Sequence, residues 1–551
     1  MDPTIALTTR FVAALADLGL RHGIVSPGAR NTPLSLAFAA EPRVVTHVVH
    51  DERSAAFVAL GIGKGSGLPA AVITTSGTAA AHLLPAIVEA RHGRVPLVAL
   101  TADRPPELRG AGAPQTVDQL HLFGDNVRLF HEMGVPDEAT ARTAASVALR
   151  VWDAAMDPPG GPVHVNLPFR EPLAIPTEPA PSPQIRYEAG YRLPEPEAVD
   201  RLATALSGRR ALIVVGGPMR PGFASAAAMV AAEAQIPVIA DIQSRFGSPA
   251  TIAFADLVVS RGVDPSLTPD VVLRVGGLPT AKALWRWLET CGVPQVFLDD
   301  GPWREPLSTA HMAVRGDPAA TLIQLVGRLA PAPDGWLRRW VATDRAVAKR
   351  IEQALEFEPF PNEPMTARTV VTSLPPAAVL FVGSSMPIRD VDTFGGVPRP
   401  DVTVLANRGA NGIDGAISSA AGAAIASGRP VVALVGDISV LHDATALGIL
   451  ARDGLEVTVV AVDNDGGGIF HFLPHAEALD AERFEMLFGT PHGTNLTAVA
   501  EAFGVPATTA TERKELRDLV ATPHGGPRLI RIPTDRAANA EVHARLREAA
   551  R

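Results

Sequence analysis

Short runs of apolar, often β-branched residues alternate with alanine-rich stretches along almost the whole chain. Examples are "AAVITTSG" in the first third, "RRALIVVGGP" in the middle and "RPVVALVGD" in the last third. A run that is apolar at every position is typical of a strand covered by helices on both faces of its sheet. The pattern therefore predicts an α/β protein with doubly wound, mainly parallel sheets.

Two proline-rich stretches divide this pattern. The stretch "PTEPAPSPQIRYEAGYRLPEP" at 176–196 has no consistent period and is interpreted as a linker, and "EFEPFPNEP" at 356–364 is a second break. A chain of 551 residues is too long for one core. We therefore expect three α/β domains of similar size, although no sequence repeat is visible between them.

The charged residues and the single cysteine limit the kind of partner. A net charge of −9 without clustered Lys or Arg argues against nucleic acid, which leaves small molecules as the expected ligands. The lone Cys291 excludes an intrachain disulfide and fits a reducing compartment. No signal peptide and no apolar run of about 18 residues is present, so we expect a cytoplasmic protein without a membrane span.

Two polar side chains follow apolar runs in the last third of the chain. Asp437 ends "VVALVGD", and Asn464 ends "VTVVAVDN" 27 residues later, which fits one strand–helix–strand crossover. Ligands of open parallel sheets bind beyond the carboxyl ends of the strands. The two oxygens suit Mg²⁺ that also holds phosphates, and the glycines at 436 and 466–468 allow a bulky anion to approach the backbone. Taken singly, Asp437 as a helix cap and Asn464 as a turn residue are equally good interpretations.

This pair resembles the metal–diphosphate motif of the thiamine diphosphate enzymes, with Ile438 where many members carry a second glycine. The segment "HDERSAAFVALGIGKGSG" resembles the part of those enzymes that offers a glutamate to the pyrimidine of the cofactor, which would be Glu52. The resemblance implies thiamine diphosphate and Mg²⁺ as cofactors, with Mn²⁺ as a possible substitute.

Further motifs are similar to one branch of this family, the MenD branch of 2-succinyl-5-enolpyruvyl-6-hydroxy-3-cyclohexene-1-carboxylate synthases of menaquinone biosynthesis. They are "SPGARNTPL", "TSGTAA" and "TADRPPELRGAGAPQTVDQ" in the first domain, and "GSSMPIRD", "ANRGANGIDG" and "GGGIFHFLP" in the third. The similarity implies a pyrimidine-binding domain at 1–178, a central domain at 195–350 and a diphosphate-binding domain at 362–551. It implies a transferase that decarboxylates 2-oxoglutarate and adds the succinyl unit to isochorismate by 1,4-addition.

The same similarity implies the residues of the site. Glu52 would be catalytic, because a buried carboxyl group at the pyrimidine nitrogen makes that ring a competent base. The structural alternative is that Glu52 is a first-turn residue that faces the helix dipole. The metal ligands would be Asp437, Asn464 and Gly466. The cofactor-binding residues would be Glu52, Thr75, Ser76, Gly77, Ile413, Gly436, Asp437, Ile438, Ser439, Asn464, Gly467, Ile469 and Phe470.

Both implied substrates are dicarboxylates, and the planar arginine side chain binds a carboxylate through two hydrogen bonds. The substrate-binding candidates by motif match are Arg30, Arg104, Gln115, Lys282, Ser385, Arg389 and Arg408. Each alone could equally be a surface ion pair. Pro114, Ala283 and His82 depart from the residues that the branch usually carries at those places.

Two other patterns invite a functional interpretation that we do not favour. The glycines of "GIGKGSG" at 61–67 fit neither nucleotide-binding loop and are expected to end the helix that contains Glu52 with flexible glycines. His47, His50 and Asp51 could suggest a metal cluster, but their place in and after a strand favours packing.

Other members of the wider family remain alternatives. Acetohydroxyacid synthase and other 2-oxoacid decarboxylases share the cofactor motifs, but their acceptors carry fewer carboxylates. A non-catalytic regulatory subunit of this fold would lack an activating acid such as Glu52. The resemblance also implies a homodimer or a dimer of dimers with active sites at the subunit interface.

Overall fold

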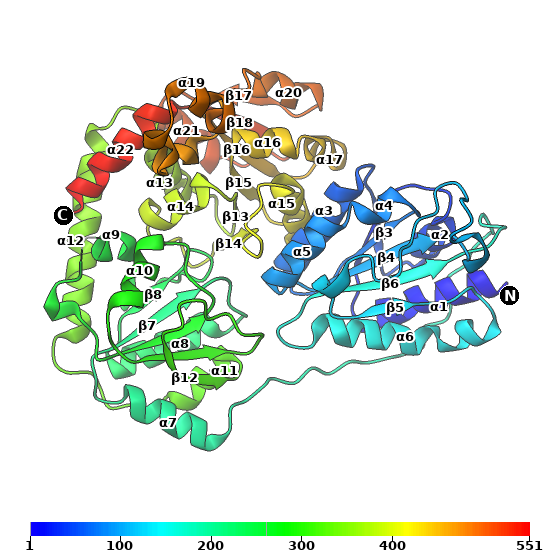
Figure 1. Cartoon of the computed structure of the whole chain (residues 1–551), viewed down its shortest axis with the longest axis horizontal. Coiled ribbons are helices and arrows are strands. Elements are labelled where there is room, and N and C mark those ends of the chain that lie inside the picture. The colour runs from blue at the N-terminus through cyan, green and yellow to red at the C-terminus, as the bar shows by residue number, and fades with distance from the viewer. Residues whose placement is uncertain (1, 261) are drawn as a thin grey trace.

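The computed structural model describes residues 2–260 and 262–551, and within them three six-stranded sheets in which every strand pair is parallel. Each sheet is covered by helices, and the three units follow one another along the chain (Figure 1). This confirms the predicted α/β class with doubly wound, parallel sheets.

The first sheet lies between two layers of helices. Its strands, in spatial order, are β2 (Val45–Val48), β1 (His22–Val25), β3 (Ala71–Thr74), β4 (Leu97–Asp103), β6 (Pro162–Pro168) and β5 (Phe130–Glu132). Its helices are α1 (Pro3–Leu18), α2 (Thr32–Ala40), α3 (Glu52–Ser66), α4 (Thr78–Ala81), α5 (Leu84–Gly93) and α6 (Glu138–Met156). One core packs α1, α2 and α6 against the sheet, and the core on the other face contains α3 and α5.

The central sheet has the same six-stranded form. Its strands, in spatial order, are β12 (Ala310–Arg315), β11 (Gln295–Asp299), β10 (Val271–Gly276), β7 (Ala211–Gly216), β8 (Val238–Ala240) and β9 (Thr251–Ile252). Its helices are α7 (Pro196–Leu206), α8 (Phe223–Ala234), α9 (Ala255–Val259), α10 (Lys282–Thr290), α11 (Pro318–Leu325) and α12 (Trp336–Phe357).

The third sheet repeats the arrangement. Its strands, in spatial order, are β14 (Thr403–Ala406), β13 (Val379–Val382), β15 (Val431–Gly436), β16 (Val457–Asp463), β18 (Arg528–Pro533) and β17 (Ala507–Thr509). Its helices are α13 (Glu363–Ser373), α14 (Met386–Phe394), α15 (Ala416–Ser427), α16 (Asp437–His442), α17 (Thr445–Asp453), α18 (His475–Ala478), α19 (Ala481–Phe484), α20 (Leu496–Ala502), α21 (Arg513–Ala521) and α22 (Arg536–Ala549).

The two proline-rich breaks differ in the structure. Residues 169–195 contain no helix or strand, and Figure 1 shows this segment as a long crossing from the first unit to α7. The second break is shorter than expected, because α12 continues past residue 350 to Phe357 and α13 already begins at Glu363. The buried Ile351 and Leu355 keep the end of α12 packed against its neighbours, which offsets the helix-breaking tendency of the prolines that follow.

Helices α3 and α15 join the first sheet to the third through a shared core. A Cβ at Gly61 would lie 2.1 Å from the carbonyl oxygen of Ser419, and a Cβ at Gly422 would lie 2.1 Å from that of Val58. The expectation that the glycines of 61–67 end the helix is therefore wrong for all but Gly67, which caps α3 at a φ of 73°. The others lie inside α3, where α15 leaves no room for a side chain at Gly61, and Val95 and Pro96 leave none at Gly63.

Among the described residues, no helix is both long and apolar enough to cross a membrane.

Candidate active site

The carboxyl ends of β15 and β16 bring Asp437 and Asn464 together. The two strands are neighbours, and Asp437 begins α16 directly after β15. Oδ2 of Asp437 accepts hydrogen bonds from the backbone N–H of Asn464 at 3.1 Å and of Gly466 at 2.9 Å. Burial raises the pKa of Asp437. The three residues expected to hold a metal thus form one cluster.

The side chain of Asn464 carries an oxygen that the protein leaves without a partner. Its Oδ1 is buried and accepts no hydrogen bond among the described residues, whereas its Nδ2 donates to Oε1 of Glu363 at 2.9 Å. A buried amide oxygen without a partner costs free energy unless a ligand satisfies it. An oxygen-seeking cation such as Mg²⁺ fits this donor set of a carboxylate and an amide oxygen.

His492 is a member of this cluster that the sequence did not reveal. Asp437, Asp463 and His492 offer ligand atoms that lie within 4.8 Å of one another. Nδ1 of His492 accepts from the backbone N–H of Thr494 at 2.9 Å, so the ring proton is on Nε2, which faces Oδ2 of Asp437 at 3.3 Å. In this tautomer His492 donates a hydrogen bond to Asp437 and is not itself a metal ligand.

The glycines beside Asn464 allow backbone segments to approach closely. Gly466 has a φ of 134°, and a Cβ there would lie 1.9 Å from the carbonyl oxygen of Gly489. A Cβ at Gly467 would lie 2.0 Å from the carbonyl oxygen of Phe488. At Gly436, by contrast, nothing lies within 4 Å of such a Cβ among the described residues, so the backbone borders open space there. At Gly466 and Gly467 the backbone of Gly489 and Phe488 therefore occupies the space that a side chain or a ligand would need.

The remaining cofactor candidates of the third unit lie on the loops and helix starts at this end of the sheet. Ser439 is buried in α16 and Ile438 is half-buried beside it. Ile469 and Phe470, in a short 3₁₀ helix at Gly468–Phe472, are also half-buried, as is Ile413 in the loop before α15.

Glu52 is the first residue of α3, and its neighbours fasten this helix end to the third unit. Asp51 caps the helix through Oδ1, and its Oδ2 accepts from Oγ1 of Thr445 at 3.2 Å. Arg53 donates to the carbonyl oxygen of His442 at 2.6 Å. Glu52 itself is half-buried and makes no side-chain hydrogen bond among the described residues. Because Asp51 already satisfies the helix end, Glu52 is not needed as the cap.

The candidates of the first unit gather around the end of β3. The backbone N–H of Arg30 donates to Oγ1 of Thr75 at 3.3 Å. Gln115 is held to the "TSG" segment by two hydrogen bonds. Its Nε2 donates to the carbonyl oxygen of Ser76 at 3.0 Å, and Oγ of Ser76 donates to the carbonyl oxygen of Gln115 at 3.0 Å. Gly77, which adjoins Gln115, donates its N–H to Oε1 of Gln119.

In each of two pairs of arginines, one member lowers the pKa of the other, although Arg30 also pairs with Glu171 at 3.7 Å. Burial and the like charge of Arg104 lower the pKa of Arg30, whose Nε is buried without a partner among the described residues. Burial and the like charge of Arg408 lower the pKa of Arg389 in the same way. Arg389 also donates to the carbonyl oxygen of Ser385, which precedes α14. Such cationic pairs attract carboxylates.

Lys282 stands apart from these groups. It is an exposed residue at the start of α10 in the central unit and makes no hydrogen bond or ion pair among the described residues. The possible cluster of His47, His50 and Asp51 is not a candidate metal group in the described part of the chain, and His47 instead contacts His22 at 3.2 Å.

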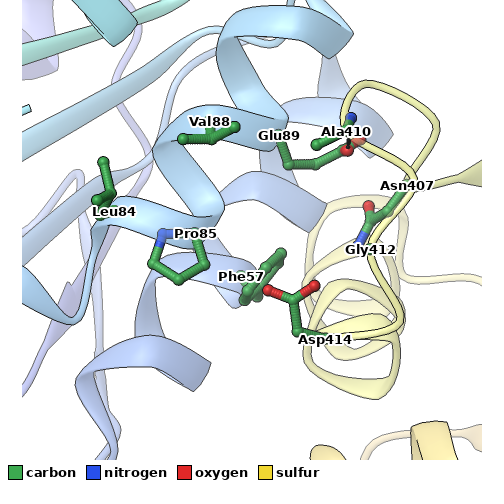
Figure 2. A pocket seen from close by; sticks show the side chains of 9 residues that line it. All are labelled: Phe57, Leu84, Pro85, Val88, Glu89, Asn407, Ala410, Gly412 and Asp414. Carbon is green, nitrogen blue, oxygen red and sulfur yellow. Dashed lines mark hydrogen bonds between the residues drawn. The ribbon is translucent and has the colours of Figure 1, made fainter.

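A cavity of about 310 Å³ lies between the first and third units (Figure 2). Figure 2 shows α5 on one side and the loop before α15 on the other, with Phe57 and Asp414 between them. Glu89 fixes this loop, because its carboxylate accepts from the backbone N–H of Gly409 at 2.9 Å and of Ala410 at 2.7 Å. The loop that contains Ile413 is therefore held by the first unit.

Comparison with known proteins agrees with this geometry. Residues 5–122 match the family described as thiamine pyrophosphate enzyme, N-terminal TPP binding domain, and residues 396–532 match the corresponding C-terminal TPP binding domain. Three relatives are each named 2-succinyl-5-enolpyruvyl-6-hydroxy-3-cyclohexene-1-carboxylate synthase. The protein of Myxococcus xanthus is 41% identical over 96% of this chain and 94% of its own length. That of Geobacillus kaustophilus is 40% identical over 98% and 97%, and that of Rubrobacter xylanophilus 41% over 96% and 96%.

The identity extends over nearly the full length of both chains, and the matched thiamine pyrophosphate domains contain the clusters around Asp437 and Thr75. This chain belongs to the 2-succinyl-5-enolpyruvyl-6-hydroxy-3-cyclohexene-1-carboxylate synthase family of thiamine pyrophosphate enzymes.

Proposed function

We propose that the protein condenses 2-oxoglutarate with isochorismate, with loss of CO₂, to form 2-succinyl-5-enolpyruvyl-6-hydroxy-3-cyclohexene-1-carboxylate. The observation that carries the proposal is the buried, unpartnered Oδ1 of Asn464 beside Asp437, inside the region that matches the C-terminal TPP binding domain. The names of the relatives supply the reaction.

The protein would hold Mg²⁺ and the diphosphate of its cofactor at the ends of β15 and β16. Asp437, Oδ1 of Asn464 and the carbonyl oxygen of Gly466 are the proposed ligands, and such oxygen donors suit Mg²⁺ that also holds phosphates. The open space at Gly436 favours the diphosphate at that position. Thiamine diphosphate, when bound, would supply the nucleophilic carbon that the decarboxylation of a 2-oxo acid requires.

The side chains of this protein would then transfer a proton and bind the substrate carboxylates. Glu52 would share a proton with the pyrimidine nitrogen, because its side chain is half-buried and free of other hydrogen bonds in the described structure. The arginines would bind carboxylates, with Arg30 and Arg104 on one side and Arg389 and Arg408 on the other. Ser385 and Gln115 would orient the same substrates, and Lys282 would approach them from the central domain.

The smallest active unit is proposed to be a homodimer. Glu52 of one subunit and Asp437 and Asn464 of the other would complete each site, as the resemblance to thiamine diphosphate enzymes implies. Two equal sites related by a two-fold axis are the arrangement that an isologous interface produces.

A reconstitution experiment tests the reaction. Purified protein with thiamine diphosphate and Mg²⁺ is given 2-oxoglutarate alone and then together with isochorismate, and the products are identified by mass spectrometry. We expect one CO₂ released for each addition product, whose mass is that of the two substrates less CO₂. Turnover of pyruvate to an acetohydroxy acid, or failure to bind thiamine diphosphate, would contradict the proposal.

A further inference from the structure

Glu363 lies directly behind Asn464 and was not expected from the sequence. It is the first residue of α13, only 3% of its surface is exposed, and Oε1 accepts from Nδ2 of Asn464 at 2.9 Å. The signal was hidden because Glu363 belongs to the proline-rich stretch that reads as a break between domains.

A carboxamide has a donor end and an acceptor end, and its neighbours decide which end points where. The carboxylate of Glu363 can accept the N–H of Asn464 but would repel its oxygen. The oxygen therefore points away from Glu363, where it is buried without a partner. Gly468 packs so closely that a Cβ at that position would lie 2.5 Å from Nδ2 of Asn464, so the amide has little room to turn.

The backbone of Glu363 is held by a buried residue of α22, which belongs to a hydrogen-bonded chain that reaches α14. Its backbone N–H donates to Oδ1 of Asn539 in α22 at 3.2 Å. His543 donates from Nδ1 to the carbonyl oxygen of Asn539 at 2.8 Å, and its Nε2 contacts Oδ1 of Asp390 in α14 at 2.7 Å. All four residues are at most 4% exposed. The start of α13 beside Asn464 is thus anchored within the fold.

We propose that Glu363 is a positioning residue that fixes the carboxamide of Asn464 with Oδ1 toward the metal ion. It acts through Asn464 and does not touch the metal, the cofactor or the substrate. The inference rests on the proposed function, because it concerns the same metal–diphosphate site. Groups of this kind, behind a metal ligand, typically change metal affinity by about 10- to 100-fold when they are removed.

Three variants of the full chain separate this role from a structural one. Glu363→Leu removes the acceptor, Glu363→Asp keeps the charge but is one methylene too short, and Glu363→Gln keeps an oxygen at the right distance. The dissociation constant of Mg²⁺ is measured by isothermal titration at a fixed concentration of thiamine diphosphate. We expect Leu and Asp to weaken Mg²⁺ binding at least about 10-fold and Gln to stay within about threefold of the unsubstituted protein.

A control variant and a double variant complete the test. Asp344→Ala removes another buried carboxylate, which accepts the backbone N–H of Phe254 in the central domain, and should lower the Tm without changing Mg²⁺ affinity. In an Asn464→Ala background, Glu363→Asp should have no further effect on Mg²⁺ affinity, because the two residues act as one unit. If Glu363→Leu does not fold, the comparison of Asp with Gln decides alone.

Two results would overturn the inference. One is an unchanged Mg²⁺ affinity in both the Leu and the Asp variants, and the other is a Gln variant as weak as the Asp variant. These failures are distinct from a failure of the proposed function, which would show as absence of Mg²⁺-dependent thiamine diphosphate binding by the unsubstituted protein.

Discussion

Glu52 and Asp51 are adjacent carboxylates with different surroundings at the start of α3. Asp51 caps the helix and accepts from Thr445, so its hydrogen-bonding capacity is used within the fold. Glu52 is half-buried and has no such partner in the described structure. A half-buried carboxyl group without such a partner is available for proton transfer, and this distinguishes the two residues.

Glu52→Gln should leave the fold and cofactor binding almost intact and lower kcat by orders of magnitude, because it removes only the proton-handling group. Steady-state kinetics and a thiamine diphosphate titration measure the two effects. Glu138→Gln, at the exposed first turn of α6, is the matched control and should behave like the unsubstituted protein. Retention of most activity by Glu52→Gln would refute the assignment.

Asp437→Ala should weaken thiamine diphosphate binding, and excess Mg²⁺ should partly restore it. The substitution removes one anionic oxygen, while Oδ1 of Asn464 and the carbonyl oxygen of Gly466 remain as the other proposed ligands. Isothermal titration at low and high Mg²⁺ measures the effect, with Asp453→Ala at the exposed end of α17 as the control. An unchanged cofactor affinity would show that Asp437 does not hold the metal.

Arg389→Ala should raise the KM for a dicarboxylate substrate far more than it lowers the Tm. Loss of one charge-assisted contact typically costs about 2–5 kcal/mol of binding. Arg399→Ala removes an exposed arginine of the same domain that pairs with Asp401 at 3.0 Å, and should change neither quantity. Equal losses of folding and binding in Arg389→Ala would instead identify a structural arginine.

At the scale of elements, one buried carboxylate connects helices of two domains. Asp443, between α16 and α17, accepts hydrogen bonds from the backbone N–H of Ser418 in α15 at 2.7 Å and from its Oγ at 2.8 Å. Ser54 of α3 also donates to it, at 3.5 Å. Burial raises the pKa of Asp443 to about 6, although the Ser418 hydrogen bonds oppose this.

This raised pKa predicts how stability depends on pH. The folded state binds a proton at Asp443 more tightly than the unfolded state does. The resulting contribution to the free energy of unfolding is fully present below pH 3.8 and is lost as the pH rises through about 6. The fall in Tm of the cofactor-free protein between pH 4.5 and 7 should therefore be smaller in Asp443→Asn. Asp453→Asn, which alters an exposed carboxylate, should keep the original slope. Identical slopes for all three proteins would contradict the prediction.

The strands show where local patterns are informative. The apolar runs in "AAVITTSG", "RRALIVVGGP" and "RPVVALVGD" form β3, β7 and β15, whereas β5, β9, β12 and β17 have no run of this kind. All four lie at the end of a sheet; β5, β12 and β17 have half-exposed or alternating burial, and β9 has only two residues. Without a continuous apolar run, nothing in the local sequence distinguishes these four edge strands from loops.

At the scale of the whole molecule, the central domain is tied to the helix that follows Ser385. Arg245, from the central domain, pairs with Asp392 of α14 at 2.6 Å, and both side chains are buried. Asp392 also accepts the backbone N–H of Ile242 at 3.0 Å. The central domain therefore supports α14, which carries Arg389, whether or not Lys282 contacts substrate.

Mixing two inactive variants tests the shared site. If each site combines Glu52 of one subunit with Asp437 of the other, a dimer of one Glu52→Gln chain and one Asp437→Ala chain has one fully unsubstituted site. A well-exchanged equal mixture should then regain about a quarter of full activity, because half of the dimers are mixed and each has one of two sites intact. A mixture that stays inactive, or a monomer with full turnover, would contradict the dimer.

The sequence by itself determined the α/β class, the inner strands and the pairing of Asp437 with Asn464, because continuous apolar runs and the ends of successive parallel strands are local features. The tertiary structure alone decided that Gly61 of α3 serves close packing against α15, and that His492 and Glu363 adjoin Asp437 and Asn464. Glu363 and Asn464 are 101 residues apart and come from elements on different segments of the chain. No local spacing encodes such a contact, since it depends on how α13, α14 and α22 pack around the end of the third sheet.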